Sequence, residues 1–384
     1  MGRCRVDQSI ERVVVEGFAF PMGAYPVEPM QPKPGFTLAF ESADGDDSGQ
    51  DSEWEEWPDR YVYDILLSAT RVEALCRSLL AMLPGRVFPI LDVLGHDAFR
   101  EVDPYVSYEL IGLDRFLDTL RRYRGYFFED GLVGFGAMSD EPFLYIFVDE
   151  HKIVTVRCEV ALKERIDSLL AAFDLKEIEA IAGADSATHE HRAVLDAPED
   201  RPDLLTADEI VEELREDWRL SLNIDPDTNV DDAGTDLGIT GWRCLVRYDP
   251  TEPVAEDDSG DSSEPAEAEE EEKPAKKPFK VPAKLPAKPS TAEKSGTPEQ
   301  ARVTRYVDVF VTADCLNKAI DLAFEGFDQA ATKSDLLAGD ADPDPLIVAT
   351  ERMTEEEFGD AVKQATGQSP DMEQSKVWHA AWLT

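Results

Sequence analysis

The sequence predicts an α+β fold of two small mixed-sheet domains, with helices packed on the sheets and a long insertion interrupting the second domain. Three observations lead to this prediction. The chain has 384 residues, which is the length of about two typical domains. Hydrophobic residues make up 42% of it, enough to build cores. Short runs of β-forming residues alternate with segments of helical periodicity.

The first domain is expected over residues 1–175, and its regular pattern begins after an acidic loop at 41–59. Residues 61–68 (YVYDILLS) are rich in aromatic and branched side chains, which predicts a strand. Thr70 and Glu73 have the spacing of a capping box for the helix that follows. That helix repeats its apolar residues at intervals of three and four, which predicts one buried face.

The rest of the first domain continues the alternation. The expected elements are, in order, strands near 87–93 and 105–110, a helix over 113–123, strands near 132–138, 143–148 and 153–157, and a helix over 162–173. Gly125 is expected to end the first of these helices. The order predicts one sheet with its helices on one face.

Residues 176–205 lose this periodicity and gain Asp, Pro and His, so we expect an interdomain linker there. The second domain, 206–384, opens with a capping box formed by Thr206 and Glu209. Its further expected elements are strands over 242–248 and 306–312, a helix over 316–327, a strand over 346–350, a helix capped by Thr354 and Glu357 and ended by Gly367, and a strand from residue 376 onward.

The insertion covers residues 250–301, where an acidic block precedes a block of Lys and Pro. It has no apolar periodicity, and proline breaks helices, so disorder is expected. The strands on either side, 242–248 and 306–312, should be neighbours in one sheet. Residues 64–72 and 308–316 resemble each other weakly. We interpret both segments as generic strand-to-helix junctions rather than as a duplication.

Acidity dominates the composition, with 81 Asp and Glu against 38 Lys and Arg and a formal net charge of −43. Phosphate backbones and anionic membranes would be repelled, so neither nucleic-acid nor membrane binding is expected. One interpretation is a heavily solvated surface, as in cells with a salty interior. The other is electrostatic binding to a basic protein partner.

The five cysteines are far apart and form no CxxC pair, which predicts reduced thiols rather than a zinc site or a disulfide framework. Cys76 and Cys244 should be small buried hydrophobes. The N-terminus has no apolar signal region, and no apolar run is long enough to span a membrane. We therefore expect a soluble, cytoplasmic protein.

Two acidic runs resemble parts of a calcium loop. Asp225, Asp227, Asn229 and Asp231 alternate as oxygen ligands do, but Val230 stands where the sharp turn needs glycine. The run from Asp44 to Glu55 lacks flanking helices. We expect calcium at neither run, because so acidic a chain produces such matches by chance.

His189 and His191 could chelate a transition metal from an extended segment. A solvated linker is the preferred interpretation of this stretch, because no third histidine lies near it in the sequence. No metal site, cofactor or catalytic residue is therefore predicted. Trp54 and Trp57, in the acidic loop, are expected to dock on their own domain.

No phosphate-binding loop or nucleophile motif is present, and 81 carboxylates leave no basis for choosing an acid–base pair. The leading hypothesis is a non-enzymatic binding or regulatory protein. The first alternative is an enzyme with a dispersed carboxylate or metal site. The second is an acidic mimic of nucleic acid.

Overall fold

A computed structural model describes residues 3–43, 58–95, 97–198, 200–201, 203–248, 304–333 and 345–383. Most of the acidic loop, with Trp54, Trp57 and the Asp44–Glu55 run, lies outside the described residues. The insertion expected to be disordered, 250–301, lies outside them as well.

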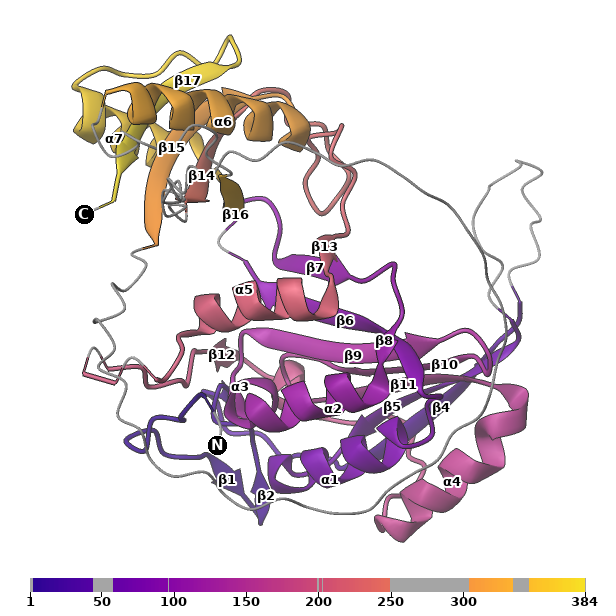
Figure 1. Cartoon of the computed structure of the whole chain (residues 1–384). Coiled ribbons are helices and arrows are strands. Elements are labelled where there is room, and N and C mark those ends of the chain that lie inside the picture. Colours follow the sequence, from indigo (N-terminus) through magenta and orange to yellow (C-terminus); the bar gives the residue numbers. More distant parts are fainter. Residues whose placement is uncertain are drawn as a thin grey trace, which may run out of the picture.

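A nine-stranded sheet forms the base of the molecule, drawn in indigo to pink in Figure 1. Its strands run in the order β13-β7-β6-β9-β10-β11-β5-β4, with β8 pairing beside β6, and neighbours are antiparallel. Their bounds are β4 Gly35–Glu41, β5 Arg60–Leu66, β6 Arg86–Leu94, β7 Val102–Val106, β8 Ile111–Gly112, β9 Val133–Ser139, β10 Leu144–Val148, β11 Val154–Glu159 and β13 Ser221–Leu222.

Five helices cover one face of this sheet. They are α1 Ala69–Leu80, α2 Leu113–Arg122, α3 Arg124–Glu129, α4 Lys163–Ala172 and α5 Ala207–Trp218. The order of the elements predicted three of them in this unit, those at 69–80, 113–122 and 163–172. Alternate strand residues such as Tyr63, Phe135 and Val156 point into one core with the apolar helix faces. Cys76 lies in this core, and its burial raises the pKa of its thiol to about 12.

The segment expected to be a linker, 176–205, runs back along this first unit instead of leaving it. Its strand β12 (His189–His191) pairs with β3 (Ala24–Pro26) near the N-terminus. Further bridges join Val6 to Leu195 and Lys33 to Ala182. Beside these lie the short strands β1 Val14–Val15 and β2 Phe18–Ala19. Backbone pairing thus fixes the described part of this segment against the N-terminal residues.

Helix α5 and strand β13, which follow the expected boundary at residue 206, also pack with the first sheet. Trp218 is fully buried, with its ring stacked on Phe127 at 5.7 Å and tilted against Phe116 at 4.7 Å. Strand β13 pairs with β7. The apolar face of α5 finds its core in the first unit because these aromatic side chains line that core.

The second sheet has the order β16-β14-β15-β17, also antiparallel. Its elements are β14 Thr240–Tyr248, β15 Arg305–Ala313, α6 Leu316–Thr332, β16 Leu346–Met353, α7 Glu355–Thr366 and β17 Lys376–Trp382. Strands β14 and β15 are neighbours, which confirms the prediction made from the segments flanking the insertion. Val309 packs on α6, whereas Phe310 packs against Phe358 of α7, so the two helices cover opposite faces.

Local sequence signals were confirmed at some helix ends and wrong at others. The capping boxes of Thr206 and Thr354 both form, and Gly367 ends α7 with a positive φ of 74°. Glu73, expected in a cap, instead accepts a hydrogen bond from Arg124. Gly125 does not end a helix but lies within α3, where an added Cβ would come 2.7 Å from Val6. Of the strand expected at 105–110, only Tyr105 and Val106 lie in a strand, at the end of β7, and residues 107–110 connect β7 to β8.

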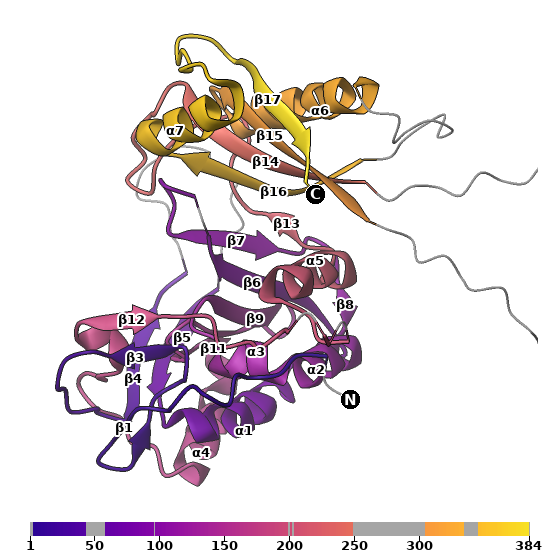
Figure 2. The same ribbon diagram turned by 90° about the vertical axis from the view of Figure 1, so that its left-hand side faces the viewer.

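The two sheets are joined by a buried ion pair. Figure 2 shows the second sheet lying above β7, β13 and α5 of the first unit. Arg352 of β16 donates from Nε to both carboxylate oxygens of Asp97, at 3.0 and 2.9 Å, and from its guanidinium to Asn229 Oδ1 at 3.1 Å. Only 3% and 1% of the Arg352 and Asp97 side chains are exposed. This pair fixes the second sheet against the β6–β7 loop.

Among the described residues, no helix combines the length and the apolar content that a membrane crossing requires.

Candidate functional site

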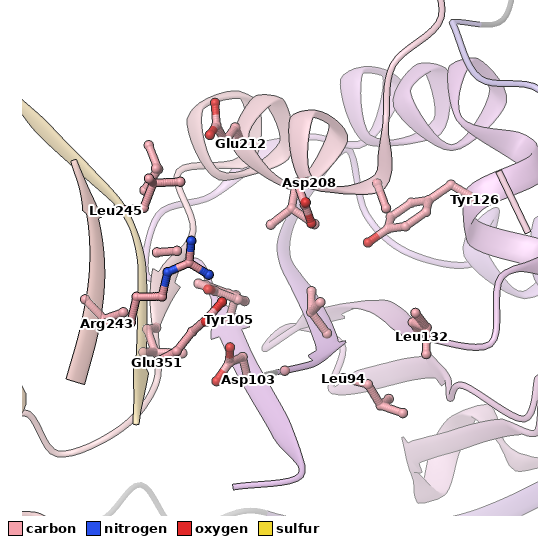
Figure 3. A pocket seen from close by; sticks show the side chains of 18 residues that line it. Leu94, Asp103, Tyr105, Tyr126, Leu132, Asp208, Glu212, Arg243, Leu245 and Glu351 are labelled. Carbon is pink, nitrogen blue, oxygen red and sulfur yellow. The ribbon is translucent and has the colours of Figure 1, made fainter. Parts of the chain in front are cut away.

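A cavity of about 510 Å³ lies between the two sheets (Figure 3). Strands β6 and β7 and helix α5 form the wall from the first unit, and β14 and β16 form the opposite wall. Its apolar lining residues include Val93, Leu94, Val211, Leu222, Leu245 and Val348. A volume of this size at a domain junction is typical of ligand-binding pockets.

Four carboxylates line this cavity against a single guanidinium: Asp103, Asp208, Glu212 and Glu351 against Arg243. Figure 3 shows Asp208 and Glu212 projecting from α5 on one side, and Glu351 close to Arg243 on the other. Arg243 already forms an ion pair with Asp308, to which its Nε and a terminal nitrogen donate at 2.9 and 3.1 Å. Two of the carboxylates are paired as well, Asp103 with Arg100 at 2.7 Å and Glu212 with Arg247 at 3.1 Å. Asp208 lines the cavity with an exposed carboxylate that makes no ion pair among the described residues.

Burial in the cavity shifts the pKa values of three ionisable side chains. Burial raises the pKa of Glu212, although Arg247 lies 3.1 Å from its carboxylate and acts in the opposite direction. Burial also raises the pKa of the Tyr105 and Tyr126 phenols. A cation bound beside Glu212 would favour the ionised carboxylate that burial disfavours.

The structure does not bring the four oxygen-bearing side chains of the 225–231 run together. Asp225 accepts a hydrogen bond from the Asp227 amide, and Asp227 accepts one from Asn317. Asn229 is buried, where its amide donates to Gly238 and Thr240 and its oxygen accepts from Arg352. Asp231 caps a turn at Ala233 and Thr235. These side chains serve separate structural contacts.

Calcium is accordingly predicted to leave thermal stability unchanged through this run. Its oxygens are already committed to separate hydrogen bonds, and rearranging Asn229 would expose a buried amide. The melting temperature of the intact chain and of the Asp225→Ala variant should respond equally to millimolar calcium. A calcium-dependent rise that disappears in Asp225→Ala would contradict the prediction.

His189 and His191 project from the same face of β12, and the turn between β10 and β11 brings His151 to them. His151 Nε2 lies 3.0 Å from His189 Nε2, which lies 3.1 Å from His191 Nε2. Burial lowers the pKa of His191. For His151 burial also acts downward, but the hydrogen bond to Asp149 and the charges of Asp149 and Glu150 outweigh it, so its pKa is raised.

Nothing in the sequence indicates that His151 belongs to this cluster. It lies 38 residues before His189, in a four-residue turn whose sequence, DEHK, carries no metal-binding spacing. The hairpin of β10 with β11 presents His151, and hydrogen bonds from Gly131 to Arg192 and from the His191 ring to Gly131 hold β12 beside the first sheet.

No protein-family model matches the chain, and neither a curated protein nor a solved structure matches it. The arguments about function therefore start from the two sites just described.

Proposed function

We propose that this chain is a non-enzymatic binding protein that captures a basic protein segment, with a Lys or Arg side chain entering the cavity between the two sheets. The observation that supports the proposal is the lining of the cavity, where apolar walls surround the exposed carboxylate of Asp208 and the lining arginine, Arg243, is already paired with Asp308. Asp103 and Glu212 are paired with Arg100 and Arg247, so Asp208 and Glu351 are the acids that we expect an entering cation to meet. Apolar walls suit the hydrocarbon stem of Lys or Arg, and carboxylates suit its charged end.

The charge of the whole chain supports a basic partner. A formal net charge of −43 creates a negative field around the molecule, which accelerates the approach of cations and repels nucleic acid. The cavity would add specificity to this long-range attraction, because its carboxylates lie on two different units of the chain. Asp208, at the start of α5, is exposed and positioned to meet an entering side chain first.

The test compares two double variants of the full chain that remove the same charge. Asp208→Asn with Glu351→Gln changes the cavity, whereas Glu164→Gln with Glu179→Gln changes two exposed acids elsewhere on the first unit. Binding of a short Lys- and Leu-containing peptide is measured by fluorescence anisotropy. We expect the cavity variant to bind about tenfold more weakly or worse, because losing a partly desolvated charge partner costs roughly 1.4 kcal/mol or more.

The surface variant should bind the peptide almost as the unchanged chain does, apart from a small effect at low salt. Equal losses in the two double variants would show that only net charge attracts the peptide. That outcome would remove the cavity from the proposal.

A further inference from the structure

We propose that His151, His189 and His191 form a binding site for one transition-metal ion of the zinc class. This inference is independent of the cavity, because the two sites share no residue. Two observations support it: three imidazole Nε2 atoms lie close together, and an acceptor lies next to the Nδ1 atom of each ring.

The Nδ1 atom of each ring faces an acceptor. His189 Nδ1 lies 2.8 Å from the carbonyl oxygen of Ala187, and His191 Nδ1 lies 2.7 Å from that of Gly131. A carbonyl oxygen only accepts hydrogen bonds, so both Nδ1 atoms carry the proton. His151 Nδ1 faces carboxylate oxygens, Glu150 Oε1 at 3.3 Å and Asp149 Oδ2 at 3.6 Å.

Three Nε2 lone pairs therefore point toward one another in the neutral rings, with no proton between them. Three acceptors at such distances repel each other. A proton on one ring would satisfy one contact and leave the remaining pair opposed. A single cation held by all three Nε2 atoms satisfies every ring at once, and neutral imidazole with its other nitrogen bonded to oxygen is the usual form of a histidine ligand.

The spacing of the cluster also suits a metal. Bonds of 2.0–2.1 Å to a tetrahedral zinc ion would place ligand nitrogens about 3.3 Å apart. The separations of 3.0 and 3.1 Å in the structure lie close to this value. The three ring planes are inclined to one another by 70–74°, with centroids 4.7–5.0 Å apart, so the rings approach their common centre edge-on.

The backbone around the cluster is fixed before any ion arrives. Lys152, next to His151, adopts a left-handed φ of 64°, and its buried ammonium donates to the Val133 carbonyl at 2.7 Å. On the other side, Gly131 touches Gly23 so closely that a Cβ on Gly131 would lie 1.9 Å from the Gly23 oxygen. Such preorganisation reduces the conformational cost of binding.

The ligand set points to zinc, cobalt, nickel or copper. Imidazole nitrogens suit these ions, whereas calcium and magnesium require oxygen ligands. Within the described part of the chain, no carboxylate or thiolate joins the three Nε2 atoms in one cluster, since Asp149 and Glu150 group with His151 separately. Three protein ligands leave a fourth position for water or an exchangeable ligand.

The experiment uses the full chain, stripped with a chelator and dialysed into buffer with excess magnesium, so that surface carboxylates do not compete for the probe. Titration calorimetry with zinc should show one ion bound per chain. Replacing zinc by cobalt(II) should give the intense visible absorption of four-coordinate cobalt, a readout that needs no variant. His151→Gln, His189→Gln and His191→Gln should each weaken zinc binding by at least about 100-fold.

Two control variants test whether the loss is specific. Glu190→Gln alters the residue between His189 and His191; its carboxylate accepts a hydrogen bond from the Tyr25 hydroxyl. His379→Gln removes a histidine on β17. Both should bind zinc as the unchanged chain does. In chelator, His151→Gln should melt no lower than the unchanged chain, because it removes one of the opposed lone pairs and, unlike the other two rings, His151 makes no Nδ1 hydrogen bond to a backbone carbonyl. In zinc only the unchanged chain and the controls should gain melting temperature.

The proposal would be overturned by an unchanged chain that binds neither zinc nor cobalt saturably, or by ligand variants that bind like the controls. Marked destabilisation of His151→Gln in chelator would also contradict it, because the three rings would then stabilise each other without an ion.

Discussion

Replacing Arg352 by Met should lower the free energy of unfolding by about 3 kcal/mol, the lower end of the effect of breaking a buried ion pair. The guanidinium is buried and holds Asp97, Asn229 and the Val230 carbonyl. The Met side chain fills much of the space of the Arg352 hydrocarbon chain, but the Asp97 carboxylate stays buried without the Arg352 cation. Arg100, 3.4 Å from Asp97, compensates in part, which is why we expect the lower end of the range.

Urea unfolding followed by circular dichroism measures this change, with Arg121→Met as the matched control. Arg121 pairs with Asp118 across an exposed helix surface, so its loss should cost no more than about 1 kcal/mol. The double variant Asp97→Leu with Arg352→Met should be more stable than Arg352→Met alone, because it removes the uncompensated charge. Equal stability of Arg352→Met and Arg121→Met would contradict a stabilising role for this contact.

Replacing Trp218 by Ala should cost about 3–5 kcal/mol, as for other large buried aromatic residues. The ring lies between Phe116 and Phe127 in the first core. Trp218→Phe should cost much less, because the indole Nε1 has no hydrogen-bond partner among the described residues and its loss breaks none. Urea unfolding of the two variants gives the comparison.

The same contact predicts where the first unit ends. A fragment of residues 1–223 should unfold cooperatively, whereas a fragment ending at residue 205 should not, because it lacks α5 and exposes the aromatic side chains that Trp218 covers. Cooperative unfolding of both fragments, together with a small effect of Trp218→Ala, would support the boundary expected from the sequence.

Local patterns predicted most of the secondary structure. The spacing of apolar residues located α1, α4 and α6, and the alternation or clustering of branched residues located β9, β10, β14 and β15. Side-chain caps were predicted correctly at Thr206 and Thr354, where Glu209 and Glu357 both complete the capping box. The cap expected at Thr70 does not form because the helix begins earlier, at Ala69 after Ser68, so that Thr70 lies within its first turn and Glu73 pairs with Arg124 instead.

The candidate sites were less accessible to sequence reasoning. His189 and His191 were considered as a pair because a two-residue spacing in a strand places both side chains on one face, but a solvated linker was the preferred interpretation. His151 was missed because its proximity arises from tertiary contacts between the β10–β11 hairpin and β12, made through Gly131. The cavity could not be predicted from the sequence either, because its carboxylates come from β7, α5 and β16, which are far apart along the chain.

The sequence by itself determined that this chain is acidic, that it forms α+β structure, and where most of its strands and helices begin and end. These properties depend on composition and on residues a few positions apart. The tertiary structure alone decided that 176–205 lies along the first unit, that α5 completes the first core, and that three histidines meet. The physical reason is that each of these depends on which distant backbone groups pair and which apolar faces meet, and local spacing does not specify the partner.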